Sequence, residues 1–292
     1  MSNDSTQQIR TYKDAVALIT GGASGIGAAI AKDLVRRGAS VILADRQLEA
    51  AQTLATSLGA KAEAVALDVR DADQFAGVVE GTKARHGRID YFFNNAGIGI
   101  GGPVQDHSLE DWRYTIDVNI LGVVYGVHAV LPILREQGFG HIINTASMAG
   151  QIPCPGLTAY ATTKHAVVGL SRSLRAESAQ AGVQVSAFCP GVIQTEILNK
   201  GGTFGRSMGW ADAEPDAEQL AKTKPMDADA FAREALDRVA ANDEIIILPR
   251  RWYMMARFDK LFPRLFSSFI ANRFASEASR LERRAASATA GK

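Results

Sequence analysis

A tyrosine and a lysine stand four residues apart in the segment YATTK at positions 160–164. Residues four apart on a helix project from the same face, so we expect the Tyr160 phenol and the Lys164 ammonium to be neighbours. A free tyrosine has a pKa of about 10, too high for a base near neutrality. An ammonium about 4 Å away, at an effective dielectric of about 20, favours the phenolate by roughly 4 kcal/mol, or some three pKa units. The pair therefore predicts a group that exchanges a proton with an alcohol.

Ser147 is the second candidate, because it follows the apolar run His141–Thr145, which predicts a buried strand. Ligands gather at the carboxyl ends of parallel strands in open α/β sheets. We therefore expect the Ser147 hydroxyl to hydrogen-bond the reacting oxygen and hold it against the Tyr160 phenol. Each residue also has a structural interpretation, since a serine after a strand commonly caps a helix and a Tyr/Lys pair commonly lies on an exposed helix face.

The segment TGGASGIG, from Thr20 to Gly27, lies between the apolar run Val16–Thr20 and Ile26–Arg37, whose apolar residues have helical spacing. Glycines allow a tight turn and let a pyrophosphate approach the backbone. The helix N-terminus adds free N–H groups and a partial positive charge. The G-x-x-x-G-x-G spacing is one residue longer than the G-x-G-x-x-G fingerprint. The turn therefore predicts a dinucleotide site.

Asp45 ends the next predicted strand, Val41–Ala44. A carboxylate at that position accepts hydrogen bonds from the adenosine ribose hydroxyls and repels a 2′-phosphate, which favours NAD. Arg46 beside it could instead hold a 2′-phosphate, so NADP stays open. Asp68-Val69, after a third strand, is placed to cap the adenine edge, although an exposed turn aspartate explains Asp68 nearly as well.

Strands and helices alternate along the rest of the chain, which predicts parallel strands joined by right-handed crossovers. We therefore predict an α/β, doubly wound parallel sheet of about seven strands, of the Rossmann type, in a single domain with a C-terminal helical extension. The further strands are Ala64–Leu67, Tyr91–Phe93, Gln184–Phe188 and Ile245–Leu248, and the further helices are Leu48–Leu58, Trp112–Arg135 and Thr158–Ala181.

The Gly-rich turn, NNAG at 94–97, Asn119, Ser147, YATTK and Pro190-Gly191 stand in the order and spacing typical of one family. Over roughly residues 13–250 the chain resembles the short-chain dehydrogenase/reductase family. The resemblance implies a hydride transfer between NAD(P) and an alcohol or ketone, with Asn119, Ser147, Tyr160 and Lys164 as catalytic residues and Asn119 holding a water that links Lys164 to solvent. The cofactor-binding residues it implies are Gly21, Ser24, Gly25, Ile26, Gly27, Asp45, Arg46, Asp68, Val69, Asn95, Ala96, Gly97, Tyr160, Lys164, Pro190, Gly191, Ile193 and Thr195.

Composition narrows the other possibilities. A net charge of +1 in 292 residues creates no general attraction to nucleic acid. Two cysteines exclude a cysteine-based zinc site, and the five histidines show no ligand spacing, so we expect no metal. No apolar leader precedes residue 14, and no stretch approaches about 18 uncharged apolar residues, so we expect a cytoplasmic protein without a membrane span.

We divide the chain into a flexible tail at 1–13, a catalytic domain at 14–250 with a substrate lid at 197–224, and an extension at 251–292. The expected pocket residues are apolar: Ile100, Met148, Ile152, Cys154, Leu157, Leu198, Met208 and Trp210. No Lys or Arg stands among them, so we predict an uncharged secondary alcohol or ketone, of steroid, aromatic or lipid-like type.

The extension is basic, with ten Lys/Arg and three Asp/Glu in residues 250–292, and Trp252 to Phe274 holds seven of the chain's 21 aromatic residues. We favour a helix docked on the body or a subunit over one lying on an anionic membrane, since apolar stripes usually face a core. Pro263 predicts a kink or a split in this helix.

Family members usually form homodimers or homotetramers through the helices at 107–135 and 158–181. Two alternatives to a dehydrogenase stay open. An enoyl-thioester reductase places six residues between the tyrosine and the lysine, whereas this chain has three. A non-catalytic nucleotide sensor is disfavoured by the intact Ser147, Tyr160 and Lys164 set.

Overall fold

The computed structural model describes residues 12–198, 205–207 and 223–290. Its centre is a parallel sheet of seven strands in the order β11-β7-β6-β4-β1-β2-β3. The strands are β1 (Val16–Thr20), β2 (Ser40–Asp45), β3 (Ala62–Ala66), β4 (Tyr91–Asn94), β6 (Gly140–Thr145), β7 (Val183–Pro190) and β11 (Ile245–Leu248). The order reverses between β1 and β4, which is where ligands bind in sheets of this kind. The predicted doubly wound Rossmann-type fold is confirmed.

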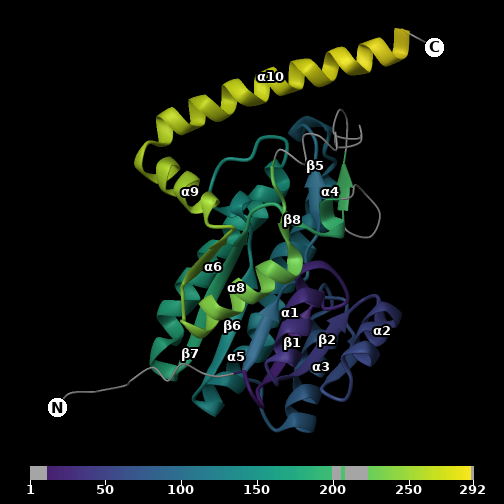
Figure 1. The fold of residues 1–292 in the computed structure, drawn as a ribbon, viewed down its shortest axis with the longest axis vertical. Helices are drawn as coiled ribbons and strands as arrows, with labels where there is room; N and C mark the ends of the chain where they lie inside the picture. Colours follow the sequence, from purple (N-terminus) through teal and green to yellow (C-terminus); the bar gives the residue numbers. More distant parts are fainter. Residues whose placement is uncertain (1–11, 199–204, 208–222, 291–292) are drawn as a thin grey trace, which may run out of the picture.

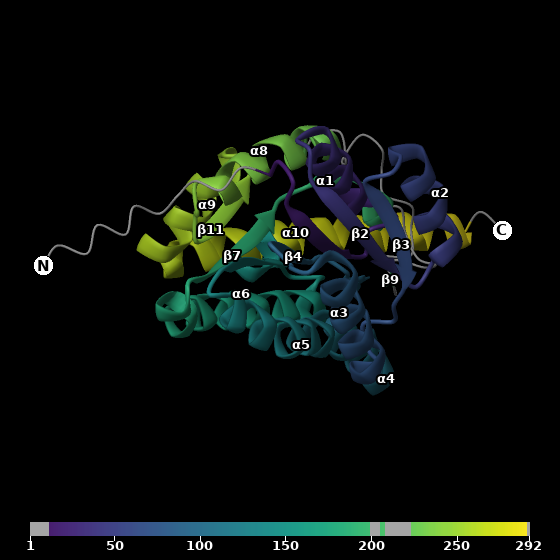
Figure 2. The same cartoon turned by 90° about the horizontal axis from the view of Figure 1, so that it is seen from below.

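Helices cover both faces of the sheet (Figures 1 and 2). On one face lie α1 (Gly25–Arg36), α2 (Leu48–Leu58) and α8 (Ala228–Ala240), and on the other lie α3 (Ala72–His86), α5 (Gly122–Gln137) and α6 (Thr158–Ser178). The buried side chains form one large cluster on each face. Because the central strands are covered on both sides, they consist of continuous apolar runs such as VALIT in β1.

Two helices, α3 and α8, are missing from the elements that the sequence predicts. In α3 the buried apolar stripe is thin, and the Asp71 side chain caps the helix by accepting a hydrogen bond from the Gln74 N–H at 2.9 Å. In α8 five buried residues have helical spacing and could have been recognised: Phe231, Ala232, Ala235, Leu236 and Val239. Three residues of the predicted lid, β9 (Gly205–Ser207), form a strand that pairs with β5 (Gly99–Gly101).

The helix predicted at 112–135 begins earlier, as α4 (Leu109–Ile116), because Ser108 and Asp111 form a capping box. It continues through the π-helical segment Asp117–Leu121 into α5. The 17 residues between Asp117 and Arg135 carry no charge, so the expectation that no stretch approaches the length of a membrane span is wrong. Leu109–Gln137 is the one helix among the described residues that is long and apolar enough to span a membrane. Val123, Val130 and Leu134 on it are buried against the sheet, so we interpret it as a core helix.

The predicted flexible tail at 1–13 is wrong for Tyr12, which belongs to the folded part of the chain. Tyr12 is buried, its hydroxyl donates to the Leu236 carbonyl at 2.6 Å, and its ring lies 4.9 Å from that of Tyr91. Residues 1–11 lie outside the described part of the chain.

The C-terminal extension forms two helices, α9 (Arg251–Leu261) and α10 (Pro263–Ala290), which divide at Pro263 as predicted. Ala256 and Phe266 are buried and belong to one apolar cluster with Met148 and Ile152. The extension therefore packs on the body through a narrow inner face. In Figure 1, α10 crosses the end of the molecule that also carries β5 and β8 (Ile193–Gln194).

Candidate active site

The Gly-rich turn leads from β1 into α1 and leaves no room for side chains. Gly21 and Gly25 have φ of +62° and +52°, a backbone conformation that favours glycine. A Cβ on Gly27 would stand 2.1 Å from the Gly21 carbonyl oxygen, so only glycine fits there. The turn is a cradle of bare backbone at a helix N-terminus, which fits the pyrophosphate of a dinucleotide.

The Asp45 carboxylate lies beside this cradle at the end of β2 and is 7% exposed. Its Oδ2 accepts a hydrogen bond from the Ala23 N–H at 3.1 Å, and its Oδ1 accepts one from the Gln47 N–H at 2.9 Å. Each carboxylate oxygen can accept more than one hydrogen bond, so both ribose hydroxyls can still be bound. Asp45 thus fixes the turn and lines the cleft beside it.

Two arginines also line this end of the cleft. Arg46 donates to the Tyr114 hydroxyl at 3.2 Å, and the Arg70 guanidinium lies 5.4 Å from the centre of the Tyr114 ring. Arg70 Nε donates to both oxygens of Asp68, at 3.0 and 3.1 Å, and these hydrogen bonds hold the pKa of Asp68 below its usual range. Asp68, which we expected to cap the adenine edge, forms an ion pair with Arg70. Arg70 itself is a lining residue of the cleft that the sequence did not indicate.

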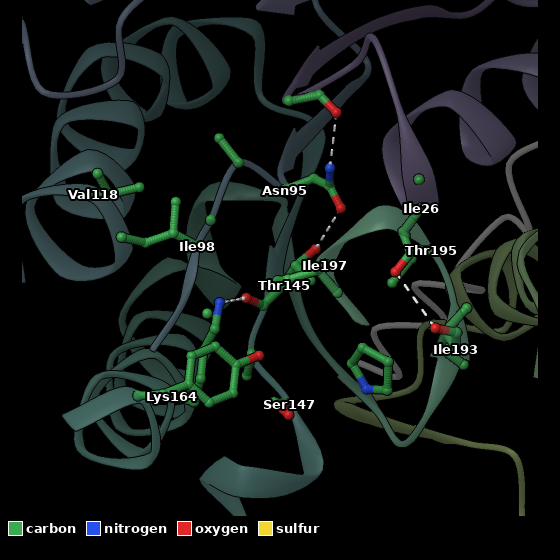
Figure 3. A pocket seen from close by; sticks show the side chains of 18 of the residues that line it. Ile26, Asn95, Ile98, Val118, Thr145, Ser147, Lys164, Ile193, Thr195 and Ile197 are labelled. Carbon is green, nitrogen blue, oxygen red and sulfur yellow. Dashed lines mark hydrogen bonds between the residues drawn. The ribbon is translucent and has the colours of Figure 1, made fainter. Parts of the chain in front are cut away.

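The NNAG segment after β4 joins the turn to the catalytic side. The Thr20 hydroxyl accepts hydrogen bonds from the N–H groups of Asn95 and Ala96, both at 3.0 Å. The Asn95 amide donates to the carbonyls of Thr20 and Gly21 at 3.2 Å, and its oxygen accepts from the Thr145 hydroxyl at 3.3 Å (Figure 3). Asn95 therefore ties the ends of β1, β4 and β6 together.

The structure brings Ser147, Tyr160 and Lys164 to one wall of the cleft, from the end of β6 and the first turns of α6. Lys164 is 3% exposed, and its Nζ donates to the Thr145 carbonyl at 2.9 Å (Figure 3). The Lys164 Nζ lies 5.5 Å from the centre of the Tyr160 ring. The Ser147 hydroxyl accepts a hydrogen bond from the Ala149 N–H at 3.1 Å and lines the same cleft as the phenol. The serine both caps a short helix and faces the tyrosine.

The electrostatics differ from the sequence expectation. Burial raises the pKa of Tyr160 to about 12, although the neighbouring Ser147 hydroxyl acts in the opposite direction. Burial also lowers the pKa of Lys164 to about 8. The expectation of a lowered phenol pKa is therefore wrong for the chain alone, because burial destabilises the phenolate more than the neighbouring groups stabilise it.

Asn119 lies in the π-helical segment and is fully buried. Its amide nitrogen donates to the Ile98 carbonyl at 3.0 Å and to the Thr163 hydroxyl at 3.1 Å, and its oxygen accepts from the Ile98 N–H at 2.9 Å. Its side chain therefore anchors the Ile98 loop and α6. A Cβ on Gly97 would stand 3.2 Å from Asn119 Oδ1 and 3.3 Å from Lys164 Nζ, so Asn119 and Lys164 meet at this glycine.

The cleft has a volume of about 440 Å³ and runs from Asp45 to an apolar end near α9. Met148, Ile152, Cys154, Leu157 and Leu198 line it, as expected for substrate residues. Ile100 is buried in β5 and lies outside the lining, as do Gly27 and Asn119, while Met208 and Trp210 lie outside the described residues. All the other expected cofactor residues line it: Gly21, Ser24, Gly25, Ile26, Asp45, Arg46, Asp68, Val69, Asn95, Ala96, Gly97, Tyr160, Lys164, Pro190, Gly191, Ile193 and Thr195.

Trp252, the second residue of α9, is a further lining residue that the sequence analysis missed. A Cβ on Gly191 would stand 2.2 Å from Trp252 Nε1, so the indole lies directly against the Pro190-Gly191 backbone. The extension thus supplies part of the wall. No motif marks this contact, because Trp252 and Gly191 are 61 positions apart.

The family model described as short chain dehydrogenase matches residues 15–203. Oxidoreductase UcpA of Escherichia coli (strain K12) is 39% identical over 234 residues, which cover 78% of this chain and 88% of that protein. A short-chain dehydrogenase/reductase of Burkholderia phymatum in complex with NAD has a TM-score of 0.77 at 28% identity, over 88% of this chain and 96% of that one. Levodione reductase has a TM-score of 0.73 at 30% identity, over 82% and 98% of the two chains.

The protein belongs to the short-chain dehydrogenase/reductase family. It is an oxidoreductase with the parallel seven-stranded sheet described above.

Proposed function

We propose that this oxidoreductase transfers a hydride between NAD(H) and an uncharged, apolar secondary alcohol or its ketone, with Tyr160 as the proton-transfer group. The observation that carries the proposal is the continuity of one cleft. It runs from the glycine cradle, past Tyr160, to an apolar end. A dinucleotide held at the cradle would extend towards the Ser147 hydroxyl and the phenol.

Each polar residue has a distinct task in the proposed mechanism. Ser147 holds the reacting oxygen by a hydrogen bond and keeps it against the phenol. Tyr160 takes the hydroxyl proton when an alcohol is oxidised and returns it when a ketone is reduced. Lys164, held by the Thr145 carbonyl, would bind the ribose of the nicotinamide, as the family resemblance implies. The nicotinamide, when bound, supplies or accepts the hydride.

The apolar end determines the substrate class. The lining residues beyond Ser147 are Met148, Ile152, Cys154, Leu157 and Trp252. Among the described lining residues the only cations are Arg46, Arg70 and Lys164, of which the two arginines lie at the opposite end. A substrate carboxylate or phosphate would therefore be desolvated beside Met148 and Ile152 without a partner.

The preference for NAD rests on Asp45, whose carboxylate would face the adenosine ribose and repel a 2′-phosphate. Arg46 and Arg70 are the groups that could hold a 2′-phosphate instead. They are engaged with Tyr114 and Asp68, respectively, so this alternative needs those contacts to break.

A screen of secondary alcohols and ketones, followed by absorbance at 340 nm with each cofactor, tests the proposal. We expect activity with NAD(H) and apolar substrates, and a loss of kcat of at least about 10²-fold in Tyr160→Phe with cofactor binding retained. Tyr125→Phe, on α5 outside the cleft lining, is the matched control and should keep full activity. Full turnover by Tyr160→Phe, or better activity with small acidic substrates, would refute the corresponding part.

A further inference from the structure

The outer face of the C-terminal helices is apolar and exposed. Met254 and Leu261 on α9 are 69% and 63% exposed, and Leu265 and Phe269 on α10 are 64% and 55% exposed. Seven of the eleven large apolar side chains that are exposed in the described residues lie between Tyr253 and Phe269. The inner residues Ala256 and Phe266 already pack on the body, so docking leaves this outer face uncovered.

Positive charge accompanies this face. The basic residues between positions 250 and 276 are all exposed: Arg250, Arg251, Arg257, Lys260, Arg264 and Arg273. The one acidic residue in that range is Asp259, which is half-buried. Arg257, Lys260 and Arg264 have no ion pair with another described residue. The rest of the chain has a net charge of −6, so the basic character belongs to this extension.

We propose that the outer face of α9 and α10 binds the surface of an anionic lipid bilayer. Exposed apolar side chains flanked by Arg and Lys complement a layer of phosphate headgroups over acyl chains. A second copy of the chain is a poorer occupant. A two-fold interface sets the same face against itself, so the basic residues of one copy would meet those of the other.

The position of this face favours a lipid surface as well. In Figure 1, α10 crosses the end of the molecule that carries β5 and β8, whose residues Gly99 and Ile193 line the cleft. Trp252 and the Phe266 cluster connect the inner side of these helices to the apolar end of the cleft. A molecule bound in this way would hold that end of the cleft near the bilayer. Delivery of a lipid-dissolved substrate is a consequence that rests on the proposed function, whereas membrane binding itself does not.

Vesicle flotation of the full-length chain tests the proposal without any substrate. The probes are vesicles of phosphatidylcholine mixed with phosphatidylglycerol, and vesicles of phosphatidylcholine alone. We expect flotation with the anionic vesicles, weaker binding to the neutral ones, and partial release at high salt. The variant Met254→Ser/Leu261→Ser/Leu265→Ser should lower the partition coefficient roughly tenfold or more. Full-length variants are preferable to a truncation at Arg250, which would uncover Met148 and Ile152.

Two controls make the outcome decisive. Val104→Ser/Leu109→Ser removes exposed apolar groups elsewhere and should bind like the unmodified chain. Circular dichroism and gel filtration of each variant check folding and oligomeric state. Equal flotation of the triple variant, or no flotation with either vesicle, would overturn the proposal. A dimer that the triple variant dissolves would show that a second copy covers this face instead.

Discussion

The contact between Gly191 and Trp252 offers a direct test of how the extension is coupled to the cleft. In Gly191→Ala, the new Cβ would stand 2.2 Å from Trp252 Nε1 and 2.4 Å from Cδ1. Gly191 is not among the glycines with positive φ, so an alanine meets no backbone strain, only the indole. Inserting a methyl into a packed contact costs about 1–3 kcal/mol. We expect Gly191→Ala to lower the free energy of unfolding by that amount.

A double-mutant cycle isolates this contact. Trp252→Ala removes the obstructing atoms, so in that background we expect Gly191→Ala to cost less than about 0.5 kcal/mol. Urea denaturation of the four proteins measures both costs. Gly169→Ala, on α6, is the control: no described atom lies within 4 Å of its added Cβ, so its effect should be the same in both backgrounds. Equal costs of Gly191→Ala with and without the indole would refute the contact and with it the role of the extension as a wall.

Two further predictions concern the cofactor cradle and the proton-transfer group. Gly27→Ala places a Cβ 2.1 Å from the Gly21 carbonyl oxygen, so we expect the Kd for NAD⁺ to rise roughly tenfold or more. The control is Gly77→Ala on α3, which has open space at its Cβ and should leave this Kd unchanged. Titration calorimetry measures both Kd values. Because burial raises the pKa of Tyr160 to about 12, the phenol is protonated at neutral pH. We therefore expect the rate of ketone reduction to be nearly independent of pH below about 8, and the rate of alcohol oxidation to rise with pH. Steady-state rates at fixed ionic strength measure both. Oxidation that is already maximal at pH 6 would contradict the raised pKa.

Local patterns in the sequence predicted the elements that place the chemistry. The alternation of apolar runs and amphipathic segments predicted the sheet, and every one of its seven strands lies within a few residues of the predicted position. The Gly-rich turn could be predicted because its backbone conformation requires glycine. At Gly27, for example, any side chain would collide with the Gly21 carbonyl oxygen. The helical spacing of Tyr160 and Lys164 sufficed to place both on one wall.

Properties that depend on tertiary surroundings could not be read in the same way. Spacing suggests how near a lysine lies to a phenol, but the pKa of Tyr160 also depends on how completely β6, α6 and the Met148 segment exclude water. Asn119 is similar: nothing in the sequence indicated that its side chain would bind Ile98 and Thr163, which lie far from it in the chain.

The C-terminal extension was recognised from its interleaved aromatic and basic residues, but the sequence could not show which of them face the body. Its aromatic and basic residues suggested either docking on protein or contact with a membrane, as if one excluded the other. In the structure, the helices are divided at Pro263, and Ala256 and Phe266 pack against the body. Docking uses one face of each helix, because residues on opposite sides of a helix cannot be buried against the same surface. Met254 and Leu261 therefore stay exposed, so docking on the body leaves a face that the proposed membrane contact would use.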